Sequence, residues 1–456
     1  QSAKKLGDYL VVSITDDTFV NKGPNRPVFT AKYRAEILAS LEFVDFVYVN
    51  ASDSAVNLIQ LISPNFYVKG QEYLNDKNDF NQKFQDESQT VLKMGGKIHF
   101  TQDIVFSSST FINRFFNQFS DEFIIWRDNF LKSFSIEDVV EFVEKISTLN
   151  IAVLGEIILD EYIFCETLGK TSKEPVLAGR ILSSKIFTGG SHAVAKTCSN
   201  LGASVHLFSE IGDMDITDYE FPNLSLTLEK SLSTTITKSR LLDESTGIKL
   251  FETYKMGEPN TIQSSLNLVA KVEKISGELN GVIACDYGHG FFDNPKIKFL
   301  DNLFIFKALN VQNNAGNYGT NSIYKFKNID FVTMNLKELR LETKRTGISL
   351  QNFITNLSET VKVGEILITK GGDGVQIITN KFEVSESPGL SANVVDRVGA
   401  GDVVLAVSSL LKMVNTPNLI NAFVSNVAGS LAIGHLGNEK ILDKRTLIKT
   451  IVGLLK

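Results

Sequence analysis

The sequence predicts an α/β protein with two domains, each built around a largely parallel sheet. Strand-like apolar runs alternate with helical spacing along most of the chain. This alternation restarts near residue 150, where a new apolar run follows a helical stretch. The length of 456 residues is also typical of two or three domains. Repeated βα units of this kind predict open parallel sheets with ligands at the carboxyl ends of their strands.

The first half supplies the clearest βα alternation. Strands are expected at residues 9–14, 44–49, 65–69 and 97–100, and helices at 31–41 and 54–62. The strand segments are continuous apolar runs, as expected of parallel strands that are buried on both faces.

A helical stretch at residues 111–148, rich in Phe and acidic residues, separates this half from a fresh strand at 151–155. We therefore predict a first domain at 1–130, a helical linker at 131–149 and a second domain at 150–456. Within the second domain, apolar and polar residues alternate at 177–187 and 234–254. This alternation predicts a small sheet that projects from the main fold.

The composition excludes several classes of protein. Apolar residues make up 43% of the chain and charged residues 21%, as in soluble globular proteins. The net charge of −6 gives no support for nucleic-acid binding. Three scattered cysteines (Cys165, Cys198 and Cys285) favour a reducing cytoplasm without disulfides or a zinc site. No run approaches 18 apolar residues, so we expect no membrane span.

The most informative motif is D-R-V-G-A-G-D at residues 396–402, followed by an apolar run. The small residues Gly399, Ala400 and Gly401 would let backbone N–H groups crowd at a helix N-terminus, which favours an anion. Asp402 could then take a proton from a substrate hydroxyl. The alternative interpretation is an ordinary glycine-containing turn.

Four further motifs suit a phosphotransferase. Asp160, just beyond the strand at 151–155, could accept hydrogen bonds from sugar hydroxyls, although it could also be a helix N-cap. Gly189 and Gly190 open a small-residue helix that a polar ligand could approach closely. Asn335 and Glu338 could orient magnesium and phosphate at a helix start, or simply cap that helix.

The fourth motif, T-K-G-G-D-G at 369–374, follows a buried strand, as expected around a nucleotide, but could be a plain hairpin.

In this order, the motifs of residues 150–456 resemble the ribokinase/PfkB family of carbohydrate kinases. The resemblance implies a ribokinase-like α/β fold with a small β lid, which often also forms a homodimer interface. It implies ATP and Mg²⁺, with Asp402 as general base and Gly399–Gly401 as anion hole. It also implies Asn335 and Glu338 near magnesium, which they hold indirectly, and Lys370, Gly371 and Gly374 near ATP.

Within that family, the chain looks most like the heptose-7-phosphate kinase type. The matching strings are L-D-E-Y at 159–162, T-S-K-E-P-V at 171–176, T-I-T-K-S-R at 235–240 and C-D-Y-G-H-G at 285–290. Lys238 and Arg240 share one strand face, which suits a substrate phosphate, unless this is a solvated face.

Two departures from that type concern the expected sugar pocket. Ala193 replaces the family's Asn, with His192 beside it, and His289 stands where Lys is usual. His192 could replace the lost amide contact or simply pack at the helix start. The sugar could therefore differ from the heptose.

Residues 1–130 resemble the cytidylyltransferase-like nucleotidyltransferase superfamily, which implies a Rossmann-like fold. The matching strings are L-G-D-Y-L-V-V at 6–12, K-G-P-N-R-P at 22–27, F-V-D at 43–45, V-K-G-Q-E-Y at 68–73 and F-S-S-S-T at 106–110. The cations Lys22, Arg34 and Lys69 suit a triphosphate and a sugar phosphate. Ser108, Ser109 and Thr110 could hold phosphates at a helix start, or merely cap it.

The H-x-G-H motif of that superfamily is not found and would precede Gln1. We therefore expect the chain as given to be a poor nucleotidyltransferase. The overall prediction is a bifunctional sugar-phosphate kinase and sugar-1-phosphate nucleotidyltransferase, of the type that makes ADP-heptose. One alternative joins a kinase for another sugar to a cytidylyltransferase for a polyol or amino-alcohol phosphate. Another is a binding or scaffold protein with a decayed transferase half.

Overall fold

A computed structural model shows the chain folded into two compact units, made mainly of residues 1–118 and 119–451. The structure describes residues 1–20, 27–52, 54–70, 80–101, 120–213, 221–258, 262–390 and 394–456.

The first unit alternates strands with helices. Strands β1 (Val11–Thr15) and β2 (Phe46–Asn50) pair in parallel, and so do β3 (Phe66–Gly70) and β4 (Lys97–Thr101). In the described part of the unit these are two separate two-stranded sheets rather than one open sheet. The helices are α1 (Ala31–Ala39), α2 (Val56–Ile62) and α3 (Phe80–Lys93).

The second unit is built on a nine-stranded sheet with the order β17-β16-β15-β14-β13-β12-β5-β8-β9. Neighbours from β9 to β15 are parallel, and β16 and β17 add an antiparallel edge. The strands are β5 (Asn150–Gly155), β8 (Ser204–Ile211), β9 (Leu224–Lys230), β12 (Gly281–Asp286), β13 (Phe306–Val311), β14 (Phe331–Asn335), β15 (Glu365–Thr369), β16 (Val375–Thr379) and β17 (Val384–Ser387).

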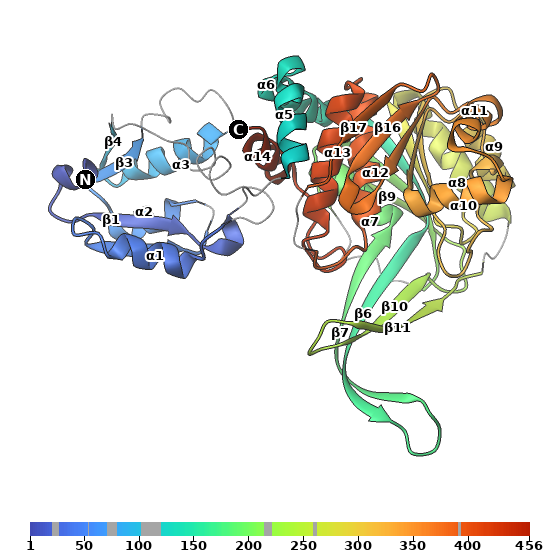
Figure 1. The fold of residues 1–456 in the computed structure, drawn as a ribbon, viewed down its shortest axis with the longest axis horizontal. Helices are drawn as coiled ribbons and strands as arrows, with labels where there is room; N and C mark the ends of the chain where they lie inside the picture. Colours follow the sequence, from blue (N-terminus) through green and yellow to red (C-terminus); the bar gives the residue numbers. More distant parts are fainter. Residues whose placement is uncertain are drawn as a thin grey trace. The chain divides into compact units, whose positions relative to one another are not determined.

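Helices cover both faces of this sheet, which is why its central strands are almost wholly apolar. Apolar residues of α8 (Ile262–Ile275), α9 (Asn294–Asn302), α10 (Leu336–Thr346) and α11 (Leu350–Thr360) form one core with the sheet. Helix α12 (Ala400–Met413) contacts β12, β13 and β14, and packs against α7 (Ser191–Asn200) and α13 (Asn418–Ala432) (Figure 1). The chain ends with α14 (Lys444–Leu455).

Helices α5 (Asp121–Ser133) and α6 (Ile136–Lys145) belong to the second unit. Trp126 of α5 donates its Nε1 hydrogen to the carbonyl oxygen of Glu386 at 2.7 Å. Its ring also lies 5.3 Å from the ring of Phe423 in α13. The domain limits at residues 130 and 150 remain a prediction from the sequence.

A separate four-stranded sheet, the lid, has the order β11-β10-β6-β7. Its strands are β6 (Ile157–Lys170), β7 (Leu177–Gly190), β10 (Thr237–Asp243) and β11 (Lys249–Lys255). Figure 1 shows the β6–β7 hairpin extending away from the main sheet. The structure thus confirms a second sheet built from the two alternating stretches, and adds β6 to it.

Candidate active site

Asp402 lies in the first turn of helix α12. Gly399 is the N-cap, with a φ of 83° that side-chain-bearing residues rarely adopt. A Cβ atom there would lie 2.5 Å from Oδ1 of Asn438. Among the described residues no side-chain cap is seen at this helix start, so the backbone N–H groups of its first turn are left for another acceptor, next to the carboxylate of Asp402. Residues 399–402 therefore begin a 14-residue helix and are not an isolated turn.

Tyr287 holds this carboxylate from the other side of the site. Its hydroxyl donates a hydrogen bond to Asp402 Oδ1 at 2.7 Å. Burial raises the pKa of Asp402 to about 7, the hydrogen bond from Tyr287 opposes this rise, and Asp160 and Lys238 act in opposite directions. A carboxyl group with this pKa is suited to general base catalysis near neutral pH. Sequence reasoning missed Tyr287, although it lies in the C-D-Y-G-H-G string.

Glu156 positions the loop that carries Tyr287. This carboxylate follows β5 and accepts hydrogen bonds from the backbone amides of Tyr287, His289 and Phe291 at 3.1, 3.0 and 3.3 Å. Burial, together with the nearby Asp286, raises the pKa of Glu156. Glu156 was not expected from the sequence, although a carboxylate directly after the first strand of a βα fold is a signal for a ligand site.

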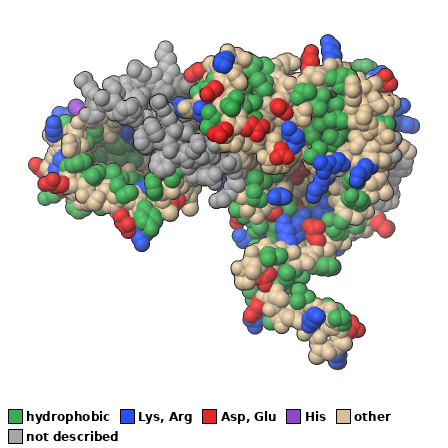
Figure 2. All heavy atoms as spheres, in the orientation of Figure 1, with side chains coloured by type: hydrophobic (Ala, Val, Ile, Leu, Met, Phe, Trp, Pro, Cys, Tyr) green, Lys and Arg blue, Asp and Glu red, His purple; other side chains and the backbone are tan. Residues whose placement is uncertain are grey.

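Lys238 and Arg240 lie on the buried face of lid strand β10, with exposed fractions of 6% and 7%. The alternative of a solvated strand face is therefore wrong. Arg240 forms ion pairs of 2.6 Å with both Asp160 and Glu252. Among the described residues, no carboxylate lies within ion-pair distance of Lys238, whose Nζ is 5.5 Å from the Tyr254 ring centroid. Figure 2 shows Lys and Arg side chains gathered where the lid joins the main body.

Asp160 lies within β6, on the buried face that it shares with Tyr162. Asp160 does lie beyond the first strand β5, as expected, but the alternative of a helix N-cap is wrong because the residue lies inside a strand. Its charge can be buried in a strand because Arg240 neutralises it across the sheet. A Cβ atom on Gly189 would lie 2.1 Å from Asp160 Oδ2, so a side chain there would displace this carboxylate.

Helix α7 begins directly after the two glycines, as expected. Gly190 is its N-cap, with a φ of 62°. His192 lies in the first turn of this helix and is 1% exposed, as in the interpretation of a packed histidine.

Asn335 and Glu338 form a capping box at the start of α10. The Asn335 side chain accepts the backbone N–H groups of Lys337 and Glu338, and Glu338 Oε2 accepts the N–H of Asn335 at 2.8 Å. Burial raises the pKa of Glu338 to about 7, and the neighbouring Asp402 contributes to this rise. Asn335 and Glu338 thus cap the helix, as in the alternative interpretation, and the Glu338 carboxyl group is also close enough to Asp402 for its pKa to be affected.

The loop at residues 370–374 joins the antiparallel strands β15 and β16, as in the hairpin interpretation. Gly371 and Gly374 have φ values of 65° and 93°. A Cβ atom on Gly374 would lie 2.1 Å from the carbonyl oxygen of Ser387, so the turn needs glycine there. Lys370 Nζ lies 3.5 Å from the Glu386 carboxylate.

Asp396, which precedes the motif's glycines, joins the lid to the loop before α12. Its Oδ2 accepts the Tyr162 hydroxyl at 2.6 Å, and its Oδ1 lies 2.7 Å from Lys249 Nζ. The backbone N–H groups of Val398 and Gly437 donate to the same carboxylate at 3.2 Å. Burial opposes ionisation, but the bonds from Lys249 and Tyr162 outweigh it and hold the pKa of Asp396 below its usual value. Sequence reasoning did not assign this residue.

In the first unit, the predicted cations that the structure describes are both paired. Arg34 Nη2 contacts Asp17 Oδ1 at 2.6 Å and the carbonyl oxygen of Thr15 at 2.8 Å. Lys69 Nζ lies 3.4 Å from Glu87. Lys22, Ser108, Ser109 and Thr110 lie outside the described residues.

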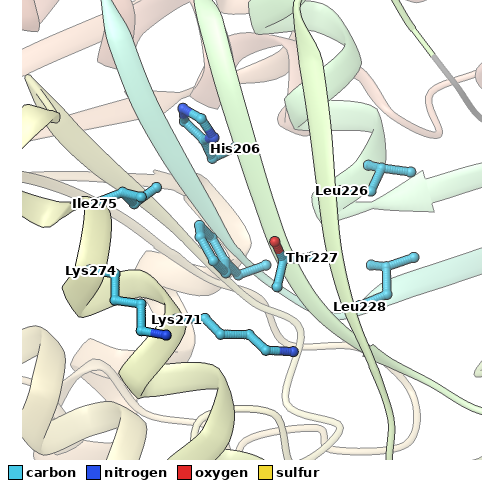
Figure 3. Close-up of a pocket in the computed structure, with 8 residues that line it drawn as sticks. His206, Leu226, Thr227, Leu228, Lys271, Lys274 and Ile275 are labelled. Carbon is cyan, nitrogen blue, oxygen red and sulfur yellow. The ribbon is translucent and has the colours of Figure 1, made fainter.

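A cavity of about 480 Å³ lies apart from these residues, between β8, β9 and α8. Figure 3 shows that His206, Lys271 and Lys274 line it together with apolar side chains.

The helices in the described part of the chain include none with the length and apolar character of a membrane-spanning segment.

Solved structures with the same fold identify the class of the second unit. Phosphofructokinase-2 from Escherichia coli superposes with a TM-score of 0.54 at 16% identity, over 68% of this chain and 100% of that chain. Ribokinase from Thermotoga maritima gives 0.53 at 17% identity, over 67% and 99%. The chain therefore contains a ribokinase-like fold.

Sequence comparison narrows this class. Residues 323–440 match the family described as pfkB family carbohydrate kinase, so the C-terminal part of the chain contains a PfkB carbohydrate kinase domain. A 79-residue stretch is 49% identical to "Bifunctional protein HldE" of Campylobacter fetus subsp. fetus and covers 17% of each chain. A 77-residue stretch is 47% identical to the protein of that name from Helicobacter pylori, over 16% of this chain and 17% of the relative. The matches thus span less than a fifth of the length of these two relatives.

Proposed function

We propose that the chain is an ATP-dependent carbohydrate kinase in which Asp402 removes the proton from the attacking sugar hydroxyl. The observation that carries this proposal is the position of Asp402 in the first, uncapped turn of α12, with its pKa raised to about 7. A base and a row of backbone N–H groups thus lie side by side. The proton goes to the carboxylate while the N–H groups of residues 399–401 stabilise the negative charge of the transferring phosphoryl group.

The carboxylates beside the base are suited to an environment that includes Mg²⁺, the usual companion of ATP. The charge of Asp402 favours the protonated form of Glu338, and a divalent cation nearby would relieve this repulsion. The capping box engages Asn335 and Glu338 with backbone N–H groups, so these side chains suit indirect contact better than direct ligation. When bound, Mg²⁺ would neutralise phosphate charge.

For the substrate, we propose a sugar phosphate, with heptose 7-phosphate as the first candidate. The resemblance to heptose-7-phosphate kinases supports this choice, and so does the buried Lys238, which lacks a carboxylate partner among the described residues. An anionic group on the substrate would supply that partner.

The test is a panel of sugars and sugar phosphates with ATP, followed by release of ADP. We expect one phosphorylated sugar to be preferred, and we expect Asp402→Asn to abolish the release. If no compound supports more ADP release by the wild-type chain than by Asp402→Asn, the proposed kinase function is wrong.

We further propose that the first unit is a nucleotidyltransferase that takes a sugar 1-phosphate and a nucleoside triphosphate. The parallel βα arrangement and the half-buried cations Arg34 and Lys69 support this proposal. Because the sequence has no H-x-G-H motif, we expect little pyrophosphate release from this chain, so titration with ATP and CTP is the test. Failure to bind either nucleotide at the first unit would contradict the proposal.

A homodimer through the lid is the third proposal. The hairpin exposes large apolar side chains, including Ile181 at 64% and Ile186 at 55%, and apolar side chains are visible on it in Figure 2. Sedimentation velocity should give a dimer for the wild-type chain and a monomer for Ile181→Asp. A wild-type monomer at micromolar concentration would contradict this proposal.

A further inference from the structure

His289 occupies a tightly held position beside the candidate active site. It lies in the loop after β12, between Gly288 and Gly290, which have φ values of 71° and 99°. Glu156 accepts its backbone N–H at 3.0 Å and fixes the path of the loop. The His289 ring is close enough to Lys238 for the ammonium charge to contribute, after burial, to lowering the histidine pKa to about 4. The ring is therefore neutral at physiological pH.

The neighbour Asn314 determines which ring nitrogen carries the hydrogen. Its Nδ2 lies 2.8 Å from the carbonyl oxygen of Tyr287, which can only accept, and its Oδ1 accepts the N–H of Gly316 at 2.9 Å. These contacts assign the amide orientation. The same Nδ2 lies 3.4 Å from His289 Nε2, so Nε2 accepts. A neutral imidazole whose Nε2 accepts carries its hydrogen on Nδ1.

Nδ1 of His289 is buried and has no hydrogen-bond partner among the described residues. A buried N–H donor without an acceptor is unfavourable and calls for a partner. Lys238, whose charge acts on this ring, carries only donors and has no ion-pair partner in the described part of the chain. His289, with its unpaired Nδ1, thus lies near Lys238, and Lys238 in turn lies near Asp402.

We infer that His289 is a specificity-determining residue whose Nδ1–H donates to an acceptor oxygen of the sugar substrate, next to the group bound by Lys238. This inference rests on the proposed kinase function and names one contact of the same site. The acceptor can be a hydroxyl or a phosphate oxygen, since both accept a hydrogen bond from a neutral imidazole. Lysine at this position would add a second charge, whereas histidine adds a directional neutral donor.

Two substitutions at residue 289 separate the two ring nitrogens. His289→Asn keeps an amide N–H near the Nδ1 position, and His289→Gln places its amide near the Nε2 position. We expect His289→Ala and His289→Gln to raise KM for the preferred sugar by about 2- to 10-fold, with a smaller change in kcat. His289→Asn should have a KM close to that of the wild-type chain. His99→Ala, on an exposed residue of β4, is the matched control and should leave KM unchanged.

Comparing the phosphorylated sugar with the unphosphorylated sugar shows which substrate oxygen accepts the hydrogen bond from His289. If the KM increase of His289→Ala disappears with the unphosphorylated sugar, the acceptor belongs to the phosphate; an equal increase with both sugars assigns a hydroxyl. Unchanged KM values for the Ala and Gln variants with both sugars would overturn the inference.

A measurement without turnover keeps this inference separable from the kinase proposal. In ¹⁵N NMR of the full chain, which has five histidines, His289→Asn identifies the signals of this ring. We expect the Nδ1–H tautomer in the free protein and a shift of the Nδ1 signal when heptose 7-phosphate is added. The Nε2–H tautomer would overturn the inference even if the kinase is active. Absence of kinase activity with every sugar would refute the kinase proposal, whereas the tautomer would still be measurable.

Discussion

Tyr287 and Asp402 are joined by a 2.7 Å hydrogen bond although 115 residues separate them in the chain. Tyr287 comes from the loop after β12, and Asp402 from the first turn of α12. The bond holds one carboxylate oxygen, which fixes the orientation of the proposed base. It also favours the ionised form of Asp402, because the hydroxyl donates to it.

Asp402→Asn should lower kcat by about 10²–10⁴-fold, because loss of a general base typically has this effect. Folding and ATP binding should change little, since the amide has nearly the same shape. Steady-state kinetics and ATP titration are the measurements, with Asp128→Asn on an exposed part of α5 as the control. A variant that retains more than about a tenth of the wild-type kcat would contradict the role of the base.

The pH dependence of kcat/KM should show an acid limb with a midpoint near the pKa of Asp402, about 7. Burial raises this pKa, so the carboxyl group gains a proton as the pH falls through that value, and the protonated form cannot act as a base. Rate measurements across the acid and neutral range test this. A rate that stays constant to well below the midpoint would show that no such group is needed.

Tyr287→Phe should move this acid limb to higher pH. The hydroxyl hydrogen bond lowers the pKa of Asp402, so its removal leaves burial less opposed. Activity should therefore fall most at acidic pH and recover in alkaline buffer. Tyr318→Phe, at an exposed position, serves as the control and should leave the limb in place. A limb that shifts to lower pH in Tyr287→Phe would contradict the assigned effect of the hydrogen bond.

Lys238→Met should raise KM for the phosphorylated sugar by about 10-fold or more, because a charge-assisted contact is lost. Methionine preserves much of the apolar stem within the lid. Lys185→Met is a matched control, since Lys185 lies on the same sheet with a side chain that is 51% exposed. The same KM change with the phosphorylated and the free sugar would show that Lys238 does not bind the phosphate.

Arg240→Ala should reduce the free energy of unfolding by about 3–5 kcal/mol, because the buried Asp160 would lose its ion-pair partner. The exposed pair of Lys185 and Glu439 offers a comparison, and Lys185→Ala should cost about 1 kcal/mol or less. Calorimetric unfolding of the three proteins measures both effects. Equal losses for the two variants would contradict a structural role for the Arg240 ion pairs.

Local patterns in the sequence were enough to predict the elements that carry the proposed chemistry. The small residues before Asp402 predicted a helix start, and α12 begins at Ala400. The i, i+2 spacing of Lys238 and Arg240 predicted one shared strand face, and both side chains are buried on the same face of β10. Such features depend on residues within one or two turns or strand repeats, so their signal is local.

Tertiary structure alone decided what each side chain contacts. The sequence could not pair Arg240 with Asp160, 80 residues away, nor place Asp160 inside β6, because the charge is tolerated there only once the lid strands lie side by side. Glu156, Tyr287 and Asp396 escaped notice because their partners come from distant segments. The order of strands in a sheet brings such residues together, and a pattern within one segment carries no information about its neighbours in space.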